Sequence, residues 1–128
     1  MTPFSYESRQ EIGKREAWTC ECGRSFKDGW MVQASHYDHD KSSDYYDDPN
    51  NGCIECIPCH LHRHIELMIE DDCNWSFNSV RLLVLGAWNN GLHTRKYYES
   101  DPDQLERDRY EIIDILDSYG LDKDQFLG

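Results

Sequence analysis

The sequence predicts a small α+β domain that is held together by a bound zinc ion. Two cysteine pairs lie far apart in the chain, Cys20-Glu-Cys22 and Cys56-Ile-Pro-Cys59, and together they offer the four thiolates of a closed tetrahedral zinc site. A short strand candidate lies between the pairs, and helical apolar patterns lie on both sides of them. A chain of 128 residues buries limited surface, so a stabilising metal is expected. The alternative is two unrelated pairs of buried thiols.

The first third of the chain is expected to form a helix, a turn and a short strand. Residues 5–17 have helical spacing, with Ile12 as their only aliphatic anchor. Residues 18–24 should form the turn that carries the first cysteine pair, whose one-residue spacer is tighter than the usual two. The dipeptide Asp28-Gly29 is a turn signal, and residues 31–34 after it are the strand candidate.

The middle of the chain is expected to form a loop, a second turn and a helix. Residues 40–52 are rich in Asp, Ser and Asn, as loops are. The second turn carries the second cysteine pair, and a helix is expected from about Cys59 to Glu70. Pro58 stands just before this helix, where a missing N–H costs no hydrogen bond.

Two further helices are predicted in the C-terminal region. The first has a cap at Asn74 or Ser76 and stops at residues 89–91. The second has a cap at Ser100 or Asp101, Pro102 in its first turn, and a stop at Gly120. Each has an apolar face at helical spacing, namely Val80, Leu83, Val84, Ala87 and Trp88 in the first and Leu105, Ile112, Ile113, Leu116 and Tyr119 in the second. We therefore divide the chain into a core of residues 1–74 and a helical, acidic extension of residues 75–128.

The charge of the chain is strongly negative and unevenly distributed. Acidic residues outnumber Lys and Arg by 25 to 13, which gives a net charge of -12 and is unfavourable for binding nucleic acid. Residues 1–34 carry five acids and five bases, whereas residues 99–124 carry ten acids and three bases. The acidic stretch is interpreted as a solvated helix face or, alternatively, as a surface that mimics DNA or binds a basic protein partner.

Localisation is predicted from two absences in the sequence. No run of eighteen apolar residues is present, so no membrane span is expected. The N-terminus lacks the pattern of a secretory signal, so a cytoplasmic protein is expected. The six cysteines are then thiols or metal ligands rather than disulfides. Cys53 and Cys73, which stand outside the pairs, are interpreted as small buried apolar residues.

A second group of metal-ligand side chains lies apart from the cysteines. His60 and His64 are four residues apart on the expected helix, so they share a face and could ligate one ion, whereas His62 points elsewhere. The alternative is a solvated histidine-rich surface. Asp38 and His39 lie between the strand and the loop. A carboxylate suits a hard divalent ion, and a neutral imidazole accepts a proton from water near neutral pH.

The span from Cys20 to His64 resembles an HNH, or His-metal-finger, nuclease module. The stretch Val32-Gln33-Ala34-Ser35-His36-Tyr37-Asp38-His39-Asp40 is most similar to the phage recombination endonuclease VII group. That group pairs an Asp-His dipeptide with a metal-binding residue directly after the last zinc cysteine, which here is His60. Asn51, five residues before Cys56, matches the central Asn of the common pattern. The resemblance implies a ββα-metal core: a hairpin, a loop and a helix around a divalent ion, beside a four-cysteine zinc site.

The resemblance also implies a role for each of these residues. Asp38 and His60 would bind Mg²⁺ or Mn²⁺, with His64 as a further ligand. His39 would activate water for attack on the phosphate, and His36 is the alternative base. Asn51 would hold the loop that orients His39 through a backbone hydrogen bond.

The implied activity is a metal-dependent endonuclease that nicks or cleaves DNA, with structured DNA as one candidate substrate and the host cytoplasm as the location if the chain is phage-encoded. Lys41 and Arg63 are the expected phosphate contacts, and they predict modest, salt-sensitive binding. The alternative is an HNH-scaffold binding protein with little or no activity, whose acidic C-terminal region binds or inhibits a partner. A homodimer is a further association that the sequence allows.

Overall fold

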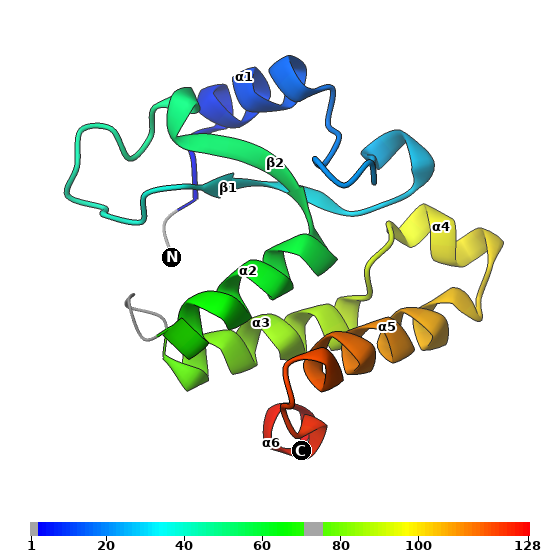
Figure 1. The fold of residues 1–128 in the computed structure, drawn as a ribbon. Helices are drawn as coiled ribbons and strands as arrows, with labels where there is room; N and C mark the ends of the chain where they lie inside the picture. The colour runs from blue at the N-terminus through cyan, green and yellow to red at the C-terminus, as the bar shows by residue number, and fades with distance from the viewer. Residues whose placement is uncertain (1–2, 71–75) are drawn as a thin grey trace. The chain divides into compact units, whose positions relative to one another are not determined.

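The computed structural model describes residues 3–70 and 76–128, which form two compact units, Met1–Cys56 and Ile57–Gly128 (Figure 1). Within these described residues lie six α-helices and one two-stranded antiparallel sheet. The mixed α and β composition predicted from the sequence is therefore confirmed. The predicted division between residues 74 and 75 falls outside the described residues.

The first unit contains one helix, two 3-10 turns and the sheet. Its elements in order are α1 (Tyr6–Glu16), η1 (Phe26–Asp28), β1 (Val32–His36), η2 (Pro49–Asn51) and β2 (Gly52–Cys56). The two strands pair antiparallel, with Val32 opposite Cys56 and His36 opposite Gly52. The predicted N-terminal helix is confirmed, and the predicted strand is present, beginning one residue later and ending two residues later than expected.

Strand β2 could not be predicted from its own residues, and only the family resemblance implied a hairpin. Four of its five residues are buried, so it lacks the alternation of buried and exposed side chains that identifies a half-buried strand. Gly52 at its start is required by close packing, because a Cβ atom there would lie 2.6 Å from the Phe4 ring. The burial of β2 is therefore set by the elements packed around it, and no alternation in its own residues identifies it as a strand.

The core of the first unit is small. Phe4, Ile12 and Ile54 form its main buried cluster, Trp18, Val32 and Ala34 pack against them, and Tyr46 is buried outside this cluster. Ser5 is the N-cap of helix α1, and its hydroxyl accepts a hydrogen bond from the Ser8 N–H at 3.3 Å.

Asp47 ties the loop after β1 to the start of α1. Its carboxylate accepts the Ser5 N–H at 2.7 Å, and its carbonyl accepts the Ser8 hydroxyl at 2.6 Å. The hydrogen bond from the Ser5 backbone lowers the pKa of the Asp47 carboxyl below its usual value. The acidic loop is therefore anchored to the start of α1 at this end.

The second unit is helical. It contains α2 (Ile57–Glu70), α3 (Phe77–Asn90), α4 (Arg95–Ser100), α5 (Gln104–Ser118) and α6 (Lys123–Leu127). Helix α3 packs against α2, α5 and α6. The buried side chains include the predicted Val80, Val84, Ala87, Ile112 and Leu116, whereas the predicted Leu83, Trp88, Leu105, Ile113 and Tyr119 are only half-buried.

Both predicted C-terminal helices are present, as α3 and α5, but the described residues 76–128 also contain two helices that were not predicted, α4 and α6. Helices α4 and α6 are six and five residues long, too short to show apolar periodicity. Side-chain caps start them instead: Thr94 accepts from the Tyr97 N–H, and Asp122 accepts from the Asp124 N–H. The predicted Ser76 cap of α3 is confirmed, and the alternative Asn74 lies outside the described residues.

The predicted cap of α5 was wrong. Ser100 ends α4 and Asp101 follows it, so the α5 helix begins after Asp103. The dipeptide Asp101-Pro102 therefore separates two helices instead of starting one.

A buried carboxylate holds the turn between α3 and α4 against α5. Asp108 is 1% exposed and accepts hydrogen bonds from Leu92 N–H at 3.1 Å and from Gln104 Nε2 at 2.8 Å. The Tyr98 hydroxyl also donates to it, and His93 Nδ1 lies 3.0 Å from its oxygens. Burial acts to raise the pKa of Asp108, but these hydrogen bonds outweigh it and hold the pKa below its usual value.

We expect Asp108 to make the stability of the second unit depend on pH. Because the pKa of Asp108 is lowered by folding, its contribution is complete above the unfolded pKa of about 3.9 and is lost as the pH falls through the lower folded value. Thermal melts followed by circular dichroism between pH 2 and pH 7 should show this loss. The variant Asp108→Asn should be less stable at pH 7 and should show a shallower acid dependence, whereas the exposed Asp114→Asn should retain the wild-type profile.

None of the helices in residues 3–70 and 76–128 has the length and apolar composition needed to cross a membrane.

Candidate functional site

Four cysteine thiols converge at the base of the hairpin. The Sγ atoms of Cys20, Cys22, Cys56 and Cys59 all lie within 4.8 Å of one another. Cys20 and Cys22 come from a tight turn in which the Gly23 N–H donates to the Cys20 carbonyl at 2.8 Å. Cys56 ends β2 and Cys59 lies three residues later in the first turn of α2. The one-residue spacer of the first pair therefore does not prevent its two thiols from pointing at the second pair.

The geometry of these thiols fits zinc. A Zn–S distance of about 2.3 Å in a tetrahedron places neighbouring sulfurs about 3.8 Å apart. The Cys22 and Cys56 Sγ atoms are 3.5 Å apart, well beyond the disulfide bond length of about 2.05 Å. Cys20 and Cys56 are buried, Cys59 is half-buried and Cys22 is exposed. The four cysteines could thus hold a structural zinc ion, as predicted.

The amide of Asn51 fixes the backbone at Asp38. Asn51 is fully buried; its Oδ1 accepts the Asp38 N–H at 2.8 Å, and its Nδ2 donates to the carbonyls of Asp38 at 3.0 Å and Tyr46 at 3.1 Å. The Asn51 carbonyl also accepts the Tyr37 N–H at 2.8 Å. The prediction that Asn51 holds this loop through a backbone hydrogen bond is therefore confirmed. Its catalytic importance stays a prediction.

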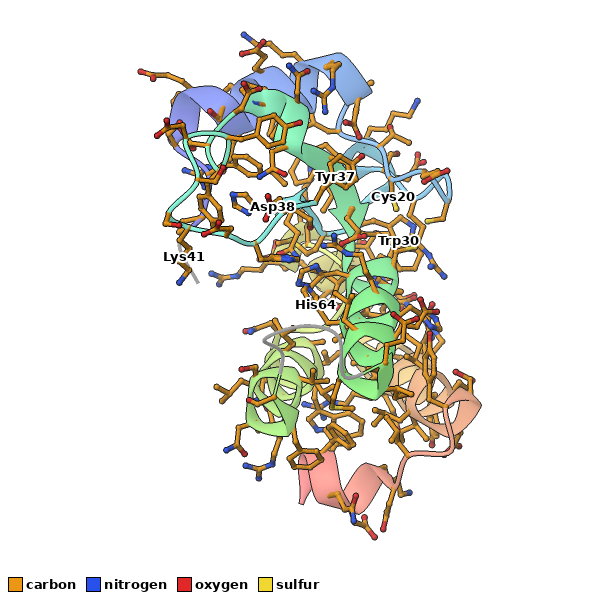
Figure 2. The ribbon with its side chains drawn as sticks, turned by 60° about the vertical axis from the view of Figure 1, so that its left-hand side comes forward. Cys20, Trp30, Tyr37, Asp38, Lys41 and His64 are labelled. Atoms are coloured by element: carbon orange, nitrogen blue, oxygen red, sulfur yellow. The ribbon has the colours of Figure 1, made fainter. Side chains whose placement is uncertain are left out.

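Asp38 and His39 lie just after β1, on the loop that also carries Lys41 (Figure 2). The side chain of Asp38 is exposed, and its Oδ1 accepts the Asp40 N–H at 2.9 Å. His39 is half-buried. The two groups are thus accessible to a ligand while their backbone is held by Asn51.

His36 is part of the core of the first unit. Its ring is 6% exposed and stacks between two aromatic rings, with centroid distances of 3.7 Å to Phe4 and 4.0 Å to Tyr46. The rings of His36 and His39 are 6.5 Å apart. This enclosure favours His39 over His36 as the group that can reach water and substrate.

His60 and His64 share one face of α2, as the four-residue spacing predicted. Their ring centroids are 4.2 Å apart, and the side chains are 6% and 0% exposed. His62 points elsewhere, as predicted, because its Nδ1 lies 3.0 Å from the Tyr119 hydroxyl. The alternative of a solvated histidine-rich surface is therefore wrong for His60 and His64.

The predicted ligands of a catalytic ion are divided between the two units. Asp38, His39 and Asn51 belong to the first unit, and His60 and His64 belong to the second. Their convergence on one ion stays a prediction, as do the phosphate contacts of Lys41, which is exposed, and Arg63, which is half-buried on α2.

Neither a protein-family model, nor a curated protein, nor a solved structure matches this chain. The assignment of a function therefore depends on the residues and their geometry.

Two features of the first unit were not predicted from the sequence. Cys53 is half-buried and hydrogen-bonds the Tyr37 side chain, so it is not simply a small apolar residue, whereas Cys73 lies outside the described residues. The pair of aromatic rings around His36 was also missed. Phe4 precedes it by 32 positions and Tyr46 follows it by ten, so no local spacing signals their stacking.

We expect Asn51→Ala to destabilise the first unit by about 2–3 kcal/mol, because it removes three hydrogen bonds and leaves the Tyr46 carbonyl without its amide donor. Denaturant unfolding followed by circular dichroism measures this change. The neighbouring Asn50→Ala is the matched control, because Asn50 is exposed and its replacement should change stability by less than about 0.5 kcal/mol. Equal stability of the two variants would show that the Asn51 hydrogen bonds are not structural.

Proposed function

We propose that this chain is a metal-dependent endonuclease of the HNH, or His-metal-finger, class that hydrolyses DNA phosphodiester bonds. The observation that carries the proposal is the Asn51 clamp on the backbone of Asp38. The clamp fixes an accessible carboxylate and the adjacent imidazole at the end of a β-strand, without using either side chain.

The chemistry of the side chains supports hydrolysis of a phosphodiester. Asp38 would contribute a hard oxygen ligand to Mg²⁺ or Mn²⁺, and His60 and His64 would contribute imidazole nitrogens from a shared helix face. When bound, such an ion polarises the scissile phosphate and stabilises the charge on the leaving 3′-oxygen. His39 would accept a proton from the attacking water, since an imidazole titrates near neutral pH. Lys41 and Arg63 would contact phosphates.

The direct test is conversion of supercoiled plasmid to nicked or linear DNA by the zinc-loaded chain with Mg²⁺ or Mn²⁺. The proposal expects activity that requires the added ion and falls with increasing salt, because phosphate contacts weaken as counterions compete for the DNA. Equal activity in wild type, His39→Ala and His36→Ala would identify a contaminant and remove the proposal.

A second candidate function is supported by a groove in the second unit. The groove has a volume of about 460 Å³ and is lined by half-buried Trp88, Leu105, Arg109 and Ile113, with exposed Glu106 beside them. The surrounding stretch of residues 99–124 carries ten acids and three bases. An apolar groove in acidic surroundings would suit a basic protein segment, so a partner-binding protein is the alternative to the nuclease.

The partner hypothesis needs a point variant rather than a truncation. Removing residues 99–128 would delete Ile112, Ile115 and Leu116, which are buried in the second unit, and would unfold it. Leu105→Asp changes the groove at a half-buried position instead. Loss of a partner with this variant, but not with the exposed Asp114→Asn, would favour the binding function.

A further inference from the structure

A groove of about 390 Å³ lies in the first unit between α1 and β1. Helix α1 contributes Tyr6, Arg9 and Gln10 to it, and Trp18 and residues 32–34 of β1 form further walls. Among the described residues that line the groove, one is basic and none is acidic. Acids outnumber bases by 25 to 13 in the whole chain, so this composition marks the groove as a local exception to the charge of the protein.

The aromatic walls of the groove are positioned by the end of α1. Tyr6 lies three and four residues before Arg9 and Gln10, so the three share a helix face, and its side chain is 68% exposed. The Trp18 ring lies against Gly13, where an added Cβ would come within 2.1 Å of the indole. Ala17 and Trp18 both have left-handed backbone conformations, with φ of 53° and 50°. This turn brings the indole back onto the helix that it follows.

The open edge of the sheet supplies polar groups to the same groove. The Tyr37 N–H donates to the Asn51 carbonyl, in register with the β1–β2 ladder. Antiparallel strands exchange hydrogen bonds at every second pair, so Gln33 is bonded to β2, and the N–H and C=O groups of Val32 and Ala34 point away from it. The sheet has two strands, so these groups lie along the outer edge of β1.

We propose that this groove binds an unpaired nucleotide of single-stranded DNA. The base stacks on the exposed Tyr6 ring, a contact that every base can make, with the Trp18 indole as a wall of the groove. Arg9 binds the adjoining phosphate, and the backbone groups of Val32 and Ala34, with the Gln10 amide, hydrogen-bond the base edge. The inference rests on the proposed nuclease function and adds that its DNA substrate contains unpaired bases.

An extended peptide paired with the β1 edge is the competing occupant, since open strands accept a further strand. The groove chemistry favours the nucleotide. A strand would use the row of backbone groups, but it has no specific need for a cation beside two aromatic walls. A nucleotide uses the ring, the cation and the backbone groups together.

The test is the anisotropy of a fluorescent oligothymidine titrated with the full, zinc-loaded chain in buffer without added Mg²⁺ or Mn²⁺, so that binding is measured without cleavage. Wild type should bind the single strand more tightly than a duplex of equal length. Tyr6→Ala should weaken binding by about 5- to 100-fold, the usual effect of losing one stacked base. Arg9→Gln should weaken it and reduce the salt dependence by about one phosphate contact.

Two exposed residues of the second unit provide matched controls. Tyr110→Ala removes a tyrosine that is 61% exposed, and Arg95→Gln removes a cation whose side chain is 93% exposed. Both should bind oligothymidine like wild type. Thermal melts of Tyr6→Ala should match wild type, because its side chain lies mostly in solvent.

Failure to bind oligothymidine, or equal binding by wild type and Tyr6→Ala, would overturn the groove assignment even if the wild type nicks plasmid. The opposite result, stacking-dependent binding without cleavage in either metal, would remove the nuclease and leave the groove as a binding site. Binding of a labelled, uncharged extended peptide that oligothymidine does not displace, and that is equal in wild type and Tyr6→Ala, would assign the groove to a peptide and overturn the proposal.

Discussion

Replacing His39 with Ala is expected to lower the rate of metal-dependent plasmid nicking by about 100- to 10,000-fold, the usual effect of losing a general base. The fold should survive, because His39 is half-buried on a loop whose backbone is held by Asn51. Zinc content and melting temperature should therefore equal those of wild type. Single-turnover nicking rates with saturating Mg²⁺ or Mn²⁺ measure the loss.

His36→Ala is the matched comparison. It should lower the stability of the fold and leave the catalytic step of the folded protein intact. Its ring stacks on both Phe4 and Tyr46, so its removal should cost about 1–3 kcal/mol from the two aromatic contacts together. Any loss of nicking should then follow the loss of folded protein and should recover at lower temperature. A stable His36→Ala protein that binds DNA but does not nick it would transfer the role of base to His36.

The pH profile separates the two histidines further. If His39 is the base, the nicking rate of wild type should rise with pH through the titration of an imidazole and then level off. The residual activity of His39→Ala should lack that inflection, while His36→Ala should retain it. A profile without an imidazole inflection in wild type would exclude either histidine as the base.

How far the sequence predicts this fold depends on how local each signal is. The cysteine pairs were predicted because each pair is adjacent in sequence and a shared zinc needs only that the two turns meet. Helix α3 was predicted because Val80, Val84 and Ala87 repeat at helical spacing and Ser76 caps it. Each of these signals lies within one turn or one helix of the sequence.

The features that were missed depend on contacts between distant residues. Gly52 is explained by the Phe4 ring, and the buried His36 by rings on both sides of it in the sequence. The hydrogen bonds that Asp108 receives come from Leu92, His93 and Tyr98, which lie between 10 and 16 residues before it in the chain. For the candidate site, the spacing of His60 and His64 and the family resemblance named the residues, and the structure adds that Asn51 bonds both the N–H and the carbonyl of Asp38.

Loss of the zinc ligands should have the largest effect on stability. The main apolar cluster of the first unit has three buried members, Phe4, Ile12 and Ile54, which is little for an independent fold. Structural zinc binds with about 10–16 kcal/mol in small zinc-dependent domains, as much as the whole stability of about 5–15 kcal/mol of a typical domain. Cys56→Ser should therefore lose zinc and unfold the first unit.

Cys53→Ser provides the control for this experiment, because Cys53 lies on the same strand but outside the four-thiol cluster. It should retain about one zinc ion per chain by mass spectrometry and the wild-type melting curve, whereas Cys56→Ser should retain neither. Strong chelators should reproduce the Cys56→Ser spectrum in wild type, since removal of the metal leaves the four converging thiols with no ion to hold them together. A zinc-free Cys56→Ser protein that melts like wild type would mean that Phe4, Ile12 and Ile54 suffice to fold the first unit. The convergence of the four thiols would then serve another purpose than stability.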